Sequence, residues 1–84
     1  MSYSILTLRR AQKQLEQVPG KDYQRVKEAI NSLAQEPRPR GCSKLVAREG
    51  WRIRVGDYRV IYEIDDSQQV VTVLHVGNRR DIYS

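Results

Sequence analysis

The feature that most constrains the fold is a run of alternating side chains over residues 51–63, interrupted by Gly56-Asp57. Alternation of apolar with polar residues predicts β-strands, and glycine in the first position of a two-residue connection favours a tight hairpin turn. In that register Arg54 lies directly opposite Arg59, and strand alternation puts Arg52 on the same face. Two like charges opposed across a sheet cost stability unless an anion lies between them, so the hairpin indicates a phosphate site.

Two segments before the hairpin carry apolar residues at helical spacing. Pro19-Gly20 is expected to end the first and Pro37 the second, and Thr7 is the candidate cap of the first. The second half of the chain alternates, which favours strands, and connections this short imply antiparallel neighbours. We expect a strand over residues 3–8, helices over 9–18 and 22–36, and strands over 43–47, 51–55, 58–65 and 69–76.

These elements predict an α+β fold, with residues 1–84 as a single domain. An N-terminal strand and a helical hairpin would pack on one face of a mostly antiparallel four- to five-stranded sheet. The helices would cover the apolar face of the hairpin. The opposite face, which carries the arginines together with Ile61 and Glu63, would stay open.

Positive charge is concentrated around the hairpin. Between Arg38 and Arg59 seven basic residues stand against two acidic ones, which accounts for the whole net charge of +5, and the rest of the chain is balanced. A local excess of this kind is an electrostatic footprint for nucleic acid, and a solvated basic face is the alternative.

The lack of long apolar runs and the small number of cysteines and histidines disfavour membrane, secreted, disulfide-bonded and metal-binding proteins. No apolar run approaches the length of a membrane span and residues 1–4 lack a secretory pattern, so we expect a cytoplasmic protein. Cys42 is the single cysteine and His75 the single histidine, so we expect neither a disulfide, nor a metal site, nor a cofactor. His75 lies in an apolar run, which is more typical of a hydrogen-bonded strand histidine than of a catalytic base.

The chemistry that remains is that of arginine acting on a phosphodiester. Cleaving RNA through its own 2′-hydroxyl needs cationic donors around the pentavalent phosphorane, removal of the hydroxyl proton, and protonation of the departing 5′-oxygen. Guanidinium supplies the first and can supply the third, because proton transfer to a fully developed alkoxide is downhill. For the second, Tyr83 is the nearest candidate, either as a base or as a platform on which a nucleobase stacks.

Each of these residues also has a structural interpretation. Arg52 and Arg54 would then be solvated charges that protect an edge strand from aggregation. The arginines of the tail would pair with Asp81, and Tyr83 would anchor the tail on the sheet. Arg59 fits such an interpretation least well, because it is expected in a central strand opposite another cation.

A family resemblance is carried by four segments: Leu15-Glu-Gln-Val-Pro19, Lys44-Leu45, Trp51-Arg-Ile-Arg-Val-Gly-Asp-Tyr-Arg-Val-Ile-Tyr62, and Val76-Gly-Asn-Arg-Arg-Asp-Ile-Tyr83. With these segments the chain resembles the RelE-type toxins of toxin–antitoxin pairs, within the wider RelE/ParE superfamily. The resemblance covers essentially the whole length, and the hairpin and tail motifs together are quite specific.

The resemblance implies a RelE-like microbial ribonuclease fold and a metal-independent endoribonuclease. Such a toxin cuts messenger RNA in the ribosomal A site by 2′-hydroxyl attack, leaves a 2′,3′-cyclic phosphate, and so inhibits translation. The implied partners are messenger RNA, the ribosome and a cognate RelB-like antitoxin that silences the toxin.

The resemblance also implies roles for individual residues. Arg59 matches the arginine that stabilises the transition state, and Arg79 matches the arginine proposed as general acid. Tyr83 matches the C-terminal tyrosine that orients or activates the substrate. Together with the charge pattern, the resemblance makes the candidate RNA- or phosphate-binding residues Arg52, Arg54, Lys44, Arg48 and Arg80.

Departures from the family pattern leave the general base unassigned. Arg52 and Arg54 stand where the best-known member has lysines, and arginine does not readily lose a proton. Asn78 stands where many relatives have histidine or lysine. Two other interpretations stay open: a ParE-like, non-enzymatic inhibitor of DNA gyrase, and an RNA-binding module without catalysis.

Overall fold

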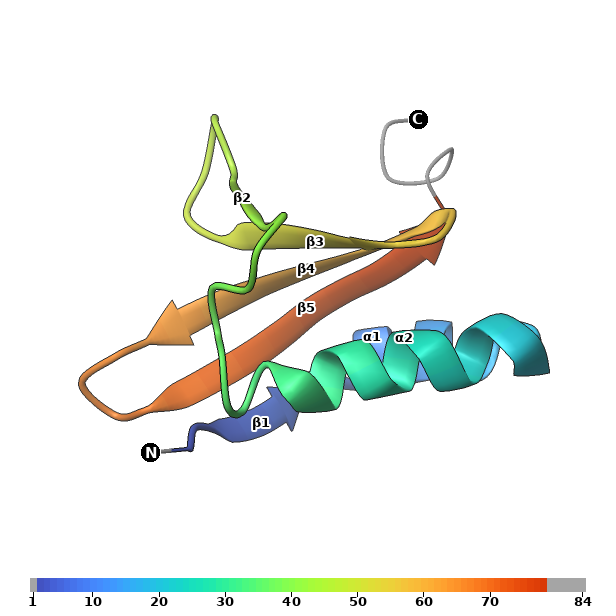
Figure 1. The fold of residues 1–84 in the computed structure, drawn as a ribbon, viewed down its shortest axis with the longest axis horizontal. Coiled ribbons are helices and arrows are strands. Elements are labelled where there is room, and N and C mark those ends of the chain that lie inside the picture. Colours follow the sequence, from blue (N-terminus) through green and yellow to red (C-terminus); the bar gives the residue numbers. More distant parts are fainter. Residues whose placement is uncertain (1, 79–84) are drawn as a thin grey trace.

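The computed structural model describes residues 2–78 and has a five-stranded sheet with two helices on one side (Figure 1). The strand order is β1-β5-β4-β3-β2, in which β1 runs parallel to β5 and the other neighbours are antiparallel. The predicted α+β fold is confirmed. Neither helix is long and apolar enough to span a membrane. The elements are β1 (Ser4–Thr7), α1 (Arg9–Glu16), α2 (Gly20–Ser32), β2 (Ser43–Lys44), β3 (Trp51–Val55), β4 (Tyr58–Asp65) and β5 (Val70–Asn78).

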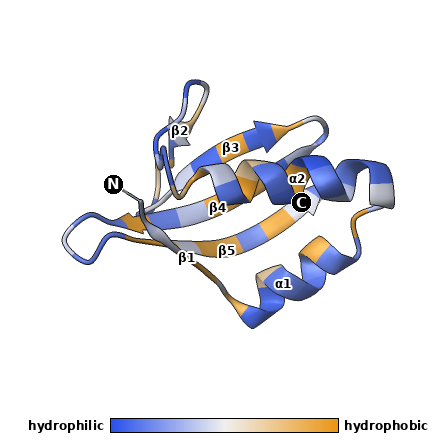
Figure 2. Cartoon of the chain, turned by 60° about the horizontal axis from the view of Figure 1, so that its bottom comes forward, coloured by the Kyte–Doolittle hydropathy of each residue, from blue (hydrophilic) through white to orange (hydrophobic). Residues whose placement is uncertain are grey.

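The core lies between the helices and the sheet, where apolar side chains of both layers meet (Figure 2). Burying one large apolar side chain contributes roughly 1.5–3 kcal/mol, so this layer holds the helices on the sheet. The opposite face of β3 and β4 is thereby left for polar side chains. The buried core residues are Ala11, Leu15, Val18, Val26, Ile30, Leu33, Ile53, Val60, Tyr62, Val71, Val73 and Val76.

The strands β3 and β4 form the predicted hairpin with the predicted bounds. Val55 pairs with Tyr58, so Gly56-Asp57 is a two-residue turn. Gly56 has a φ of 61°, in the left-handed region that favours glycine. A Cβ at this position would lie 3.3 Å from Nη1 of Arg25, which belongs to α2. The turn geometry therefore favours glycine here, while the contact with the flexible end of Arg25 is one that a small shift of that side chain would relieve.

The helix boundaries differ from the prediction around Pro19. Pro19 immediately precedes the first residue of α2, and its carbonyl accepts a hydrogen bond of 2.7 Å from the N–H of Tyr23. A proline suits this place because the first N–H groups of a helix have no partner inside it. The predicted cap of α1, Thr7, is wrong: Leu8 occupies that position and makes no side-chain cap.

Two strands differ in length from the prediction. β2 is shorter than residues 43–47, because the chain turns back and the N–H of Leu45 donates to the carbonyl of Gly50 at 3.0 Å. Gly50, which has a φ of 130°, comes directly before the first residue of β3. β5 is longer and reaches Asn78, which pairs with Tyr58 at the hairpin end of the sheet.

Candidate nucleic-acid interface

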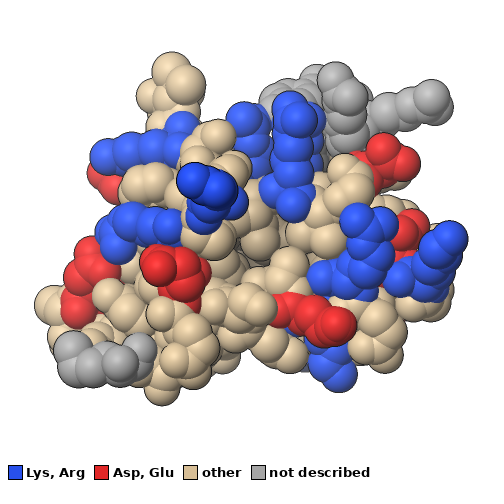
Figure 3. Space-filling view, viewed as in Figure 1, with Lys and Arg blue, Asp and Glu red and all other residues tan. Residues whose placement is uncertain are grey.

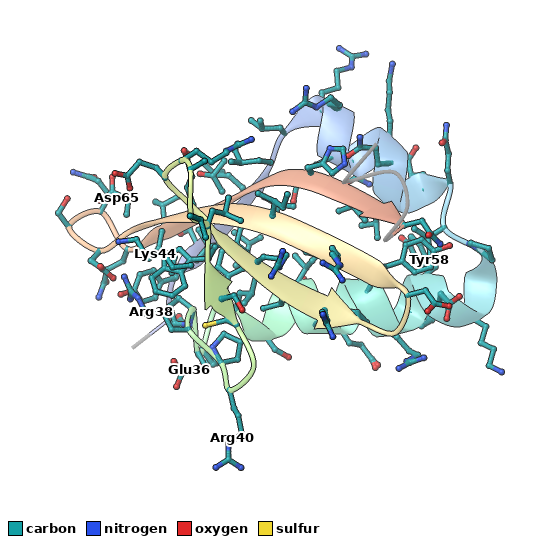
Figure 4. The ribbon with its side chains drawn as sticks, turned by 90° about the horizontal axis from the view of Figure 1, so that it is seen from above. Glu36, Arg38, Arg40, Lys44, Tyr58 and Asp65 are labelled. Carbon is teal, nitrogen blue, oxygen red and sulfur yellow. The ribbon has the colours of Figure 1, made fainter. Side chains whose placement is uncertain are left out.

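Three arginines lie on the face of the sheet that the helices do not cover. Arg54 of β3 lies directly opposite Arg59 of β4, as predicted, and Arg52 follows on the same face of β3. Figure 4 looks down on this face, where nitrogen-tipped side chains rise from β3 and β4 toward the viewer. We call these three residues the arginine face.

Burial distinguishes Arg59 from the other two arginines. Arg59 is only 4% exposed, whereas Arg54 is exposed. The prediction that this face stays open is therefore wrong for Arg59 and for Ile61, which is 9% exposed. Both lie on the central strand β4, where β3 and β5 supply neighbours on either side. Because removing a cation from water costs free energy, the fold holds Arg59 here against a solvation penalty.

The opposed cations determine what this face can bind. Like charges directly opposite each other in a sheet are destabilising, so Arg54 and Arg59 raise the free energy of the empty face. An anion between them attracts both guanidinium groups and so offsets the repulsion. Each guanidinium offers a planar fork of donors that matches phosphate oxygens. The geometry suits a phosphodiester and the additional negative charge of a phosphorane.

A groove of about 580 Å³ runs beside β3, on the side of α2 and the connector that precedes β2. Arg40, Arg52 and Arg54 line it together with small and apolar groups. In Figure 3, Lys and Arg side chains gather along the upper side of the molecule, the side on which the arginine face lies. This basic groove shares Arg52 and Arg54 with the arginine face, and positive charge in a groove suits the backbone of a single nucleic-acid strand.

The other predicted binding residues are not gathered at the arginine face. Lys44 pairs with Trp51, so strand alternation puts it on the other face from Arg52, and Figure 4 places it far from Tyr58 at the hairpin end. Arg48 is exposed in the loop between β2 and β3. Three predicted residues, Arg79, Arg80 and Tyr83, lie outside the part of the chain that the structure describes.

His75 of β5 is half-buried and hydrogen-bonded, as predicted for a strand histidine. Its Nδ1 lies 3.2 Å from Nε2 of Gln14 on α1. Oε1 of the same Gln14 accepts a hydrogen bond of 2.9 Å from the N–H of Val76. Sequence reasoning missed Gln14, because helical periodicity does not distinguish it from Gln12, the exposed glutamine of α1.

A further cavity, of about 690 Å³, lies at the other end of the sheet and has an acidic lining that includes Glu49, Glu63, Asp65 and Asp66. Such a lining repels a polyanion, so this larger cavity is a poor site for nucleic acid. Within residues 2–78, no group of three or more His, Cys, Asp and Glu side chains could hold a metal ion.

Two helices beneath a mixed sheet, with arginines on the uncovered face, are the architecture expected of the RelE/ParE class of toxins. Residues 5–83 match the family described as the ParE toxin of type II toxin-antitoxin system, parDE. Toxin RelG of Mycobacterium tuberculosis is 34% identical over 87 residues, which cover 99% of this chain and 98% of that protein. The chain therefore belongs to this family and is a toxin of a type II toxin–antitoxin system.

Solved structures support the same assignment. The archaeal RelE–RelB complex from Pyrococcus horikoshii contains a chain that is 32% identical, with a TM-score of 0.83 over 94% of this chain and 97% of that one. The toxin–antitoxin complex RelBE2 from M. tuberculosis contains one that is 30% identical, with a TM-score of 0.81 over 94% of this chain and 100% of that one. The predicted RelE-like fold is confirmed.

Proposed function

We propose that this toxin is a ribosome-dependent endoribonuclease, which cleaves messenger RNA in the A site by 2′-hydroxyl attack and so inhibits translation in the cytoplasm. The observation that carries the proposal is the position of Arg59, a buried cation in the central strand with Arg54 directly opposite. A reacting phosphodiester requires concentrated positive charge, and this position supplies it from two adjacent strands.

The arginine face acts by holding positive charge in place before the reaction begins. In the proposed site Arg52 and Arg54 clamp the scissile phosphate through their guanidinium forks. Arg59 stabilises the charge that develops on the nonbridging oxygens of the phosphorane. Because Arg59 is already desolvated, little reorganisation accompanies that step, which is the condition under which fixed donors lower a barrier most.

The tail supplies the other groups in this proposal. Arg79 protonates the departing 5′-oxygen, and Tyr83 orients the substrate by stacking or through its hydroxyl. Lys44, Arg48 and Arg80 contact the backbone of the messenger or of ribosomal RNA. This chemistry uses neither a metal ion nor a cofactor.

An antitoxin completes the proposal. The solved complexes described above pair RelE with RelB, and this supports a cognate RelB-like antitoxin for the present toxin. We expect an acidic amphipathic segment that covers the arginine face, because carboxylates would relieve the repulsion between Arg54 and Arg59 and exclude RNA.

The test is to induce the toxin in a growing culture and map the 5′ ends of transcripts. The proposal predicts new 5′ ends inside translated codons, and it predicts that purified toxin cuts a message on programmed ribosomes. Cleavage of naked RNA at the same rate would contradict the ribosome dependence.

The rival function is inhibition of DNA gyrase without catalysis, and the ParE description of the matched family is the observation in its favour. It predicts growth arrest with intact messages and a DNA-damage response. A third outcome, tight RNA binding without new 5′ ends, would identify a binding module instead.

A further inference from the structure

Gln14 takes the place of a neighbouring strand along the last part of β5. β1 pairs with β5 only as far as Val73, and the N–H of Leu8 then donates to the carbonyl of Val73 at 3.0 Å. Beyond that point no strand of residues 2–78 lies beside this edge of β5. There Oε1 of Gln14 accepts a hydrogen bond of 2.9 Å from the N–H of Val76. A side chain of α1 thus accepts the hydrogen bond of a backbone N–H at the edge of the sheet.

This bond fixes which end of the carboxamide faces His75. The N–H of Val76 is a donor, so the Gln14 atom beside it is the carbonyl oxygen. The NH₂ group of Gln14 then lies 3.2 Å from Nδ1 of His75 and donates to it. Because Nδ1 accepts this hydrogen bond, the proton of the neutral imidazole is on Nε2. A backbone N–H therefore determines the tautomer of a histidine through one glutamine.

The pair lies next to the arginine face. His75 is the cross-strand partner of Ile61, beside the register shift between Ile61 and Tyr62, and two rows further along the same ladder Gly77 pairs with Arg59. Cross-strand partners project from the same face, so β5 presents His75 and Gly77 beside Arg59. Gly77 adds no side chain at the position next to Arg59.

We propose that Gln14 is a positioning residue for the RNA cleavage proposed above, on which this inference rests. Gln14 holds the end of β5 in register with Arg59 and keeps His75 neutral, with its proton on Nε2. In this form His75 is a hydrogen-bond donor at Nε2 and cannot take the 2′-hydroxyl proton, because Nδ1 already accepts a hydrogen bond and Nε2 already carries a proton. The single histidine of the chain is therefore not the missing general base.

The first experiment reads the tautomer directly and needs no RNA. The chain has one histidine, so its two ring nitrogens give unambiguous signals in a ¹⁵N-labelled sample. We expect a protonated Nε2 and an unprotonated Nδ1 in the wild type. In Gln14→Glu one carboxylate oxygen can still accept the hydrogen bond from the N–H of Val76. The other oxygen would face Nδ1 and is also an acceptor, so Nδ1 should carry a proton. Gln24→Glu, an exposed change on α2, is the matched control and should leave His75 unchanged.

The second experiment measures kcat and KM for cleavage of a message on ribosomes. His75→Gln retains a donor near the position of Nε2, and we expect less than about a tenfold loss in kcat, whereas removing a general base costs about 10²–10⁴-fold. Gln14→Met, which loses both hydrogen bonds, should lower kcat several-fold with little change in KM.

The outcomes separate this inference from the proposed function. A wild-type His75 protonated on Nδ1, or a Gln14→Glu spectrum identical to that of the wild type, would overturn the tautomer assignment whether or not the toxin cuts RNA. A loss of 100-fold or more in His75→Gln would make His75 a base. Wild-type kcat in Gln14→Met would remove Gln14 from the reaction. If the wild type does not cleave RNA, the proposed function fails while the spectra still decide the tautomer.

Discussion

The two ends of the sheet handle charge in opposite ways. At the hairpin end Arg54 and Arg59 are opposed across adjacent strands. At the other end Arg38 binds both carboxylate oxygens of Asp66, at 2.9 and 3.3 Å, and the hydroxyl of Tyr3 donates to the same carboxylate at 2.7 Å. Opposite charges are thus paired at one end of the sheet, whereas like charges are opposed at the end that carries the proposed phosphate site.

Arg38 and Arg59 also differ in the groups that surround them. Arg38 is partly exposed, and its guanidinium lies 5.1 Å from the centre of the Trp51 ring, so it is stabilised on two sides. Arg59 is more deeply buried and has another cation as its cross-strand partner. Changes at the hairpin end should therefore affect activity more than stability, and changes at the other end should do the reverse.

The largest expected effect is that of Arg59→Ala. It removes a fixed cation from the site of developing charge, and the loss of one such donor costs about 10²–10³ in kcat. The free energy of unfolding should change less than the rate does, because the substitution also removes the like-charge opposition to Arg54. Rates on programmed ribosomes and urea midpoints test both statements. Arg10→Ala, an exposed change on α1, is the control, and equal activities of the two variants would refute the role of Arg59.

Tyr62→Phe should lower the stability of the fold and leave cleavage unchanged. The Tyr62 hydroxyl is buried and donates to the carbonyl of Pro37 at 2.7 Å, and burial raises the pKa of this phenol. Removing it leaves a buried carbonyl without its donor, which costs about 1–2 kcal/mol in the free energy of unfolding. Urea unfolding measures the loss, with Tyr23→Phe as the half-buried control. Cleavage should be unchanged, and a large drop in kcat at full stability would contradict the division between the two ends.

Arg54→Glu replaces the like-charge pair at the hairpin end with an opposite-charge pair. Replacing repulsion with attraction across the ladder should raise the free energy of unfolding by about 0.2–1 kcal/mol, the usual range for cross-strand pairs. Cleavage should fall sharply, because a carboxylate would occupy the phosphate position. Arg40→Glu, in the same groove but off the strand, is the control for net charge. A variant that is both less stable and fully active would show that the opposition of charges has no functional role.

The sequence predicted the regions in which local rules and tertiary structure agree. Alternation and Gly56 predicted the hairpin to the residue, and helical spacing predicted both helices. The central position of its strand was predicted for Arg59, but its burial was not, because alternation places a residue on a face without saying what covers it. The role of Gln14 could not be predicted from the sequence either, because it depends on where the pairing of β1 with β5 ends.

Asp66→Asn should have the smallest effect, and only above acidic pH. The hydrogen bonds from Arg38 and then Tyr3 lower the pKa of Asp66 below its usual value of 3.8. Because the folded state favours the ionised carboxylate, Asp66 contributes stability above its ordinary pKa and loses that contribution as the pH falls through the lowered value. The urea midpoint of Asp66→Asn should therefore lie slightly below that of the wild type at pH 7, and the two should converge as the pH falls below the usual pKa of 3.8. If the difference between the two urea midpoints stays constant across this range, the charge of the carboxylate does not contribute to stability. Cleavage at pH 7 should be unchanged, because Asp66 lies at the other end of the sheet from the arginine face.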